Sequence, residues 1–177
     1  MTADDLAADT PEAICHLLDL YDALLGEPET RSLVAPRLEQ RFEILGRWED
    51  FLAVVHERLR GTDDQGAAER GALRCADVAE TELQDADAGL DILLTVFARW
   101  PGSLALEERI AELATNADAW HPVADALALA LDHAEGGRDT PRLGLWLGEI
   151  RRDRLEDPVG AAEAFEKVLA VDEVSTD

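Results

Sequence analysis

The sequence predicts an all-α protein made of antiparallel helical hairpins stacked one after another. Three observations lead to this fold class. Apolar residues recur at helical spacing along nearly the whole chain, alternating strand patterns are nearly missing, and the sequence matches itself at one constant shift, which carries position 48 onto position 120. Hydrophobic residues make up 47% of the 177 positions, so the chain can bury a core and is not disordered throughout.

The predicted helices follow one another with short connections. The first spans 11–25, where Pro11 fits the first helical position and Gly26 ends the pattern. The second spans about 30–45, and Pro36 within it is expected to kink the helix or delay its start. Seven more complete a set of nine, at about 48–60, 66–82, 86–99, 103–114, 119–134, 141–154 and 158–170.

Neighbouring carboxylates occur at the predicted loops and helix starts. Such pairs could support acid–base or cation chemistry, but an acid at a helix start also accepts hydrogen bonds from free N–H groups and complements the helix dipole. Capping is therefore the preferred interpretation. The pairs are Asp63 with Asp64, Asp85 with Asp87, and Glu107 with Glu108.

The sequence aligns with itself without a gap when position 48 is placed on position 120. We call this displacement along the chain the repeat shift. It places Trp48 on Trp120, which we interpret as two structural anchors at hairpin contacts, and it places Asp85 on Asp157. Because one repeat shift spans four helices, the unit is a two-helix hairpin of about 36 residues, which buries its apolar stripe only against its neighbours. The other identities pair Leu59 with Leu131, Arg70 with Arg142, Leu73 with Leu145, Leu83 with Leu155, Val96 with Val168 and Ala98 with Ala170.

Two stretches within residues 28–172 resemble the tetratricopeptide repeat, a degenerate helical-hairpin family. The residues that carry the resemblance are Leu147, Gly148, Ala161 and Phe165 in one copy, and Phe42, Gly46, Trp48 and Phe51 in another. The resemblance implies a short right-handed α-solenoid whose concave face binds peptides or helices of other proteins. It implies neither catalysis nor a cofactor. Related half-repeat helical families and a helical bundle are the alternatives.

Composition limits the classes of partner. The 39 acidic and 16 basic residues give a net charge of −23, which argues against nucleic acid and anionic membranes because both require clustered cations. A basic partner or a salt-rich habitat would each explain the acidity. No apolar stretch could span a bilayer, and the stretch MTADDLAADT lacks the features of a secretory signal, so we expect a cytoplasmic location.

The sequence offers little chemistry, and we predict neither an enzyme nor a metal or cofactor site. Cys15 and Cys75 form no metal motif and are expected to be inert. No phosphate-binding loop is found, and Gly144 and Gly148 are interpreted as close-packing or terminating residues. No histidine lies three or four positions from another, since they are His16, His56, His121 and His133.

A contact surface is the best candidate for a functional site. Trp100 and Trp146 have no tryptophan at the equivalent repeat position, and an aromatic side chain that breaks the repeat is typical of a binding face. We therefore predict that these two residues, with Arg74 and Arg142, contribute to partner binding. Irregular packing is the alternative interpretation.

The domain prediction is a disordered acidic N-terminus (1–10), a helical repeat domain (11–171) and a disordered tail (172–177). The expected function is a non-catalytic interaction or scaffold module that binds a peptide or helix of another protein. Two alternatives stay open. The chain could self-assemble through uncapped solenoid ends or be a fragment of a longer array, or it could bind a small ligand or act as an enzyme within a helical pocket.

Overall fold

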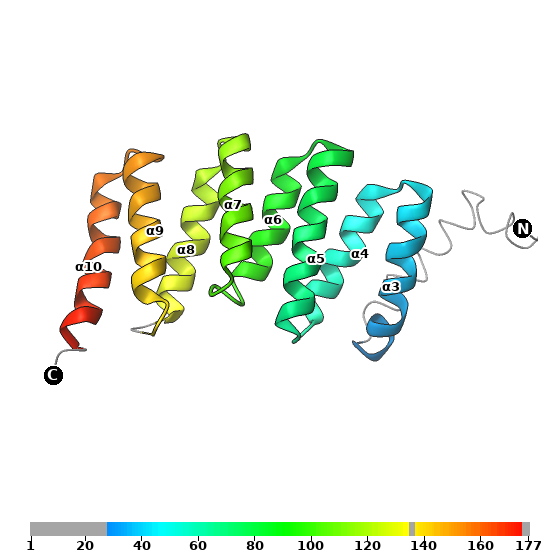
Figure 1. Cartoon of the computed structure of the whole chain (residues 1–177), viewed down its shortest axis with the longest axis horizontal. Coiled ribbons are helices and arrows are strands. Elements are labelled where there is room, and N and C mark those ends of the chain that lie inside the picture. Colours follow the sequence, from blue (N-terminus) through cyan, green and yellow to red (C-terminus); the bar gives the residue numbers. More distant parts are fainter. Residues whose placement is uncertain (1–27, 135–136, 175–177) are drawn as a thin grey trace, which may run out of the picture. The chain divides into compact units, whose positions relative to one another are not determined.

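The computed structural model describes residues 28–134 and 137–174, and all regular structure in these ranges is helical (Figure 1). The predicted all-α class is confirmed. Contacts divide the chain into two compact units, Met1–Thr62 and Asp63–Asp177. The helices are α3 (Pro28–Leu45) and α4 (Trp48–Gly61) in the first unit, and α5 (Gln65–Val78), the π-helical turn η1 (Ala79–Leu83), α6 (Ala86–Phe97), α7 (Leu104–Ala117), α8 (Trp120–Ala134), α9 (Thr140–Asp153) and α10 (Pro158–Val174) in the second.

The expected helix boundaries agree closely with the observed ones. Helix α4 begins at Trp48 and α10 at Pro158, as predicted, and α10 continues to Val174, beyond the expected end near residue 170. Pro36 does not delay α3, which begins at Pro28. The end of the predicted helix 66–82 is a π-helical turn rather than α-helix. The predicted helix over 11–25, with Cys15 and His16, lies outside the described residues.

The first unit is a hairpin in which α3 packs against α4. Glu39 on α3 is nearly buried and accepts two hydrogen bonds from Arg58 on α4, with Nε–Oε1 at 2.5 Å and Nη2–Oε2 at 3.3 Å. This two-point pairing fixes the register of the helices as well as their charge balance. Much of the apolar stripe expected for these helices is buried, through Leu38, Phe42, Phe51, Leu52, Val55 and Leu59, whereas Leu45 and Trp48 are half-buried.

In the second unit each helix packs against the next, and alternate helices also meet. Helix α5 contacts α7, and α6 contacts α8. Ion pairs extend the two series, because Arg142 on α9 pairs with Glu107 on α7, and Lys167 on α10 pairs with Asp132 on α8. The second unit therefore has two layers, one of α5, α7 and α9 and the other of α6, α8 and α10 (Figure 1).

Small residues bring helices of the second unit close together. A Cβ atom added to Gly144 would collide with Val168, and one added to Gly148 would collide with the Phe165 ring, so α9 approaches α10 closely only because both positions are glycine. The close-packing interpretation of these glycines is confirmed. Gly89 of α6 lies near α5 with less crowding, since an added Cβ would be 3.2 Å from Cα of Ala76.

Carboxylates cap helices α5 and α6, as the sequence predicts, whereas the cap of α7 is Ser103 and not Glu107 or Glu108. Asp64 accepts a hydrogen bond from N of Ala67, and Asp85 from N of Ala88, both at 3.0 Å. Asp157 accepts one from N of Gly160 at 2.9 Å. Each bond satisfies an N–H group that has no partner within the helix.

Turn geometry recurs at the repeat shift. Across 28–134 and 137–174, the residues with positive φ form two pairs, Gly46 (65°) with Asp118 (52°) and Gln84 (55°) with Glu156 (52°). Gly46 and Asp118 end helices α3 and α7 in the left-handed conformation that closes many helices. The hydrogen bonds beyond these residues match too, namely Arg47 N to Phe42 O with Ala119 N to Ala114 O, and Asp85 N to Ala79 O with Asp157 N to Arg151 O.

No helix in the described part of the chain combines the length and the apolar character needed to cross a bilayer.

Candidate functional site

Helices α7 and α9 border a shallow, open hollow of about 390 Å³, the first hollow. Its floor is apolar and its rim is charged. Trp146 is half-buried and meets the buried Phe97 edge to face, with ring centroids 6.0 Å apart, while Leu145 beside it stays 48% exposed. The lining residues are Glu107, Glu108 and Ala111 of α7, and Arg142, Leu145, Trp146 and Glu149 of α9.

Arg142 closes one end of the first hollow. Its guanidinium forms an ion pair with Glu107, donates a hydrogen bond of 2.7 Å to the carbonyl of Pro101, and lies 3.2 Å from the carboxylate of Asp139. Burial lowers the pKa of Arg142 from its ordinary value. With its donors directed to three protein groups, Arg142 holds the α6–α7 turn against α9.

The acids of the first hollow differ in their pairing. Glu107 is engaged by Arg142. Glu108 and Glu149, on α7 and α9, form no ion pair within the described part of the chain and are exposed. The rim therefore presents two carboxylates without an ion-pair partner among the described residues, beside an apolar floor.

A second hollow of about 220 Å³ lies between α8 and α9, on the other side of Trp146. Trp120, 6% exposed, begins α8 and carries the guanidinium of Arg154 over its ring, 4.9 Å from the centroid. Trp146 and Glu149 line both hollows, so the two form one surface along α9. The lining residues are Trp120, Trp146, Glu149, Ile150, Asp153 and Arg154.

The structure brings some of the predicted contact residues together. Trp146 and Arg142 line the same hollow. Trp100 is half-buried under the guanidinium of Arg99, which lies 4.3 Å from its ring centroid, and it precedes the Pro101 carbonyl that Arg142 binds. Arg74 is exposed on α5 and lines neither hollow.

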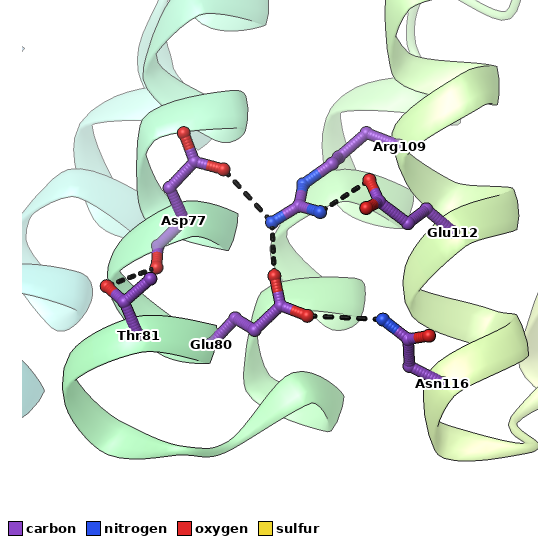
Figure 2. A network of polar contacts seen from close by, with 6 residues as sticks. All are labelled: Asp77, Glu80, Thr81, Arg109, Glu112 and Asn116. Carbon is purple, nitrogen blue, oxygen red and sulfur yellow. Dashed lines mark hydrogen bonds and ion pairs between the residues drawn. The ribbon is translucent and has the colours of Figure 1, made fainter.

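A polar network in the second unit is centred on Arg109 (Figure 2). The Arg109 side chain is only 14% exposed and reaches from α7 to Asp77 on α5 at 3.0 Å and Glu80 on η1 at 2.7 Å. It also binds Glu112 on its own helix at 2.6 Å, and Asn116 donates to Glu80 at 3.2 Å. Arg109 thus links α5, η1 and α7.

The network shifts the pKa of two of its members, Glu80 and Arg109. The hydrogen bond from Arg109 lowers the pKa of the Glu80 carboxyl below its ordinary value, against a smaller opposing effect of burial. Burial works against the charge of Arg109, but its bonds to Glu80 and Glu112 outweigh burial and raise its pKa. Because Arg109 pairs with carboxylates on α5, η1 and α7, we interpret the network as a structural link.

The remaining chemistry-bearing side chains form no site in the described ranges. Cys75 is fully buried on α5, in agreement with the prediction of an inert thiol. His121 and His133 are exposed, and His56 is half-buried on α4. Among residues 28–134 and 137–174, no group of three or more His, Cys, Asp or Glu could hold a metal ion.

Comparison with known proteins gives no relative. No family model matches the chain, no curated protein matches it, and no solved structure matches it.

Sequence reasoning missed several residues of the surface along α9. Leu145, Glu108 and Glu149 were not predicted as contact residues, and Trp120 was assigned only a packing role. One signal was present, because Trp146, Glu149 and Ile150 follow the three- and four-residue spacing of one helix face. The contribution from α7 depends on how α7 packs beside α9, which spacing along the chain does not encode.

Proposed function

We propose that this chain is a non-catalytic protein–protein interaction module whose hairpins stack as a short, tetratricopeptide-like solenoid. The recurrence of turn geometry at the repeat shift supports the repeat. The two layers of the second unit support the stacking, since a solenoid of hairpins places its first helices on one side and its second helices on the other. In this arrangement α7 and α9 belong to the layer that binds.

The single observation that carries the proposal is the first hollow. A half-buried tryptophan beside an exposed leucine supplies the kind of apolar anchor point at which binding energy concentrates. The hollow is too shallow and open to enclose a small molecule, which usually loses most of its exposed surface in a pocket. A peptide or helix laid along the surface fits this shape better.

Charge selects the class of partner. Glu108 and Glu149 face each other across the apolar floor without ion-pair partners in the described ranges, and the whole chain carries a net charge of −23. The partner is therefore a basic amphipathic segment, with a bulky apolar side chain on Trp146 and cationic side chains on the two glutamates. Its association slows as salt rises, because screening weakens the steering of opposite charges.

The test is peptide selection followed by paired substitutions. Peptides displayed in a random library and selected on the immobilised full chain are expected to be basic with one bulky apolar residue. Leu145→Ala should weaken their binding by about fivefold or more, a typical loss at an anchor position. Leu129→Ala is the matched control, because Leu129 is 52% exposed on α8 and lines neither hollow.

A second pair of variants tests the electrostatic part. Glu108→Gln combined with Glu149→Gln should lower the association rate and flatten its salt dependence, whereas Glu166→Gln on α10 should change neither. Selection of acidic peptides, or equal losses from Leu145→Ala and Leu129→Ala, would contradict the proposal.

A further inference from the structure

We infer that the second hollow, between α8 and α9, is a subsite for one cationic side chain, arginine or lysine, of a basic partner. The inference rests on the proposed function, because it assigns the chemistry of one position in the bound segment. It goes further by identifying the groups that recognise the charge.

Two indole rings line the second hollow. Trp120 comes from the start of α8 and Trp146 from the middle of α9. A cation over an indole face is attracted by the ring quadrupole, and tryptophan is the strongest aromatic partner for this contact. Ile150 completes an apolar wall against which the methylene groups of a long basic side chain can pack.

The protein's own Arg154 shows that the Trp120 ring accepts a guanidinium. Its Cζ lies 4.9 Å from the ring centroid, while Arg154 itself is exposed and forms no ion pair among the described residues. Arg154 is thus held over this ring without an ion pair in the described ranges, and a longer-range attraction to Asp153 adds to the contact. We interpret it as an internal stand-in that an incoming cation displaces.

The charges around the second hollow favour such an exchange. Of the two carboxylates that line it, Asp153 is bound by Arg152 through two hydrogen bonds of 2.7 Å. Glu149 has no such bond in the described ranges. The positive charge that balances Glu149 in the second hollow is therefore that of Arg154, as long as Arg154 lies on Trp120. A partner's cation that replaces Arg154 restores the same balance, and Arg154 moves into solvent.

The residues of the subsite are not all retained at the equivalent positions of the repeat. Under the repeat shift, Trp120, Trp146 and Arg154 correspond to Trp48, Arg74 and Glu82. One tryptophan is retained, but the second ring and the internal cation are not. A purely structural role at the start of α8 would need only the retained tryptophan.

The first experiment measures the indole N–H resonances of the full chain by NMR while N-acetylarginine amide is added. The Trp120 and Trp146 signals are expected to shift in a saturable way and the Trp48 signal to stay in place. The neutral analogue N-acetylcitrulline amide has nearly the same shape and should cause no saturable shift. Equal shifts with both compounds, or shifts at Trp48 as large as at Trp120, would overturn the inference.

Two variants sharpen the result. Trp120→Phe keeps an aromatic ring and should weaken arginine-amide binding roughly two- to fivefold, as expected for a poorer cation–π partner. Arg154→Ala removes the internal competitor and should tighten binding. Unchanged or weaker binding in Arg154→Ala would overturn the inference even if Trp120→Phe failed to fold.

The same probe separates this inference from the proposed function. Leu145 lines only the first hollow, so Leu145→Ala should leave arginine-amide binding unchanged. If the selected peptides bind through Leu145 but arginine amide does not bind the full chain, the subsite is wrong and the interaction module stands.

Discussion

At the scale of single residues, two glycines determine how closely α9 and α10 pack. Gly148 faces the Phe165 ring and Gly144 faces Val168, with no room for even a methyl group at either position. A glycine inside a helix costs about 1 kcal/mol relative to alanine. The close approach of α9 and α10 must offset that cost through added packing contacts.

Gly148→Ala should therefore destabilise the protein although alanine favours helix. Overpacking of a filled interface typically costs about 1–3 kcal/mol. Urea unfolding of the variant measures the loss. Gly66→Ala is the control, because an added Cβ there would meet the end of the flexible Arg70 side chain at 3.2 Å and Oδ1 of Asp64 at an ordinary contact distance of 3.5 Å, and it should be neutral or stabilising. Equal stability of the two variants would contradict the packing argument.

Residue identity predicted part of this picture. The glycine positions and the carboxylate caps follow from local chemistry, so Gly148 and Asp85 were correctly interpreted from the sequence. Trp48 and Trp120 show the limit of that reasoning. Both begin a helix, yet Trp48 is half-exposed beside Phe51 with ring centroids 6.1 Å apart, while Trp120 is buried beneath Arg154. Their surroundings depend on residues far along the chain.

At the scale of elements, Arg109 joins α7 to the end of α5 and to η1. Its partner Glu80 lies 29 residues earlier in the chain. Periodicity predicted each helix, because a helix is a local structure. It did not predict the link between Arg109 and Glu80, because that pair exists only once α5 and α7 lie side by side.

Arg109→Met should destabilise the protein in a pH-dependent way. Because Arg109 lowers the folded-state pKa of Glu80, the stabilisation is present above the ordinary glutamate pKa of 4.5 and is lost as pH falls through the lowered value. At neutral pH the variant should lose about 1–3 kcal/mol of unfolding free energy. The difference in unfolding free energy between the variant and the natural protein should become smaller near pH 3.

Urea unfolding at both pH values measures this effect. Arg60→Met is the matched control, because the Arg60 side chain is 64% exposed and lies 3.9 Å from Glu57 on its own helix. It should cost less than about 0.5 kcal/mol at either pH. If the difference in unfolding free energy between Arg109→Met and the natural protein stayed constant with pH, the role assigned to Glu80 would be contradicted.

At the scale of the whole molecule, charge is the dominant feature. Acidic residues outnumber basic ones 39 to 16, so many carboxylates have no cation to balance them. Their mutual repulsion opposes the compact state. Salt also screens favourable ion pairs, but exposed pairs contribute little.

Salt should therefore stabilise this protein. Between about 0.01 M and about 1 M NaCl the Debye length falls from roughly 30 Å to roughly 3 Å. The melting temperature should rise by at least about 3 °C, which corresponds to ~1 kcal/mol in a chain of this size. Thermal unfolding followed by circular dichroism measures the change, and KCl should act like NaCl. A falling melting temperature would show that ion pairs outweigh repulsion.

The turns at Gln84, Asp118 and Glu156 have a practical consequence. At each turn a residue other than glycine adopts the left-handed backbone conformation, which costs about 1–2 kcal/mol. Glycine avoids this cost, and Gly46 occupies the position equivalent to Asp118 under the repeat shift. All three residues face solvent. Replacing these three residues by glycine should therefore make the protein more resistant to heat, without altering any residue on the packed faces of its helices.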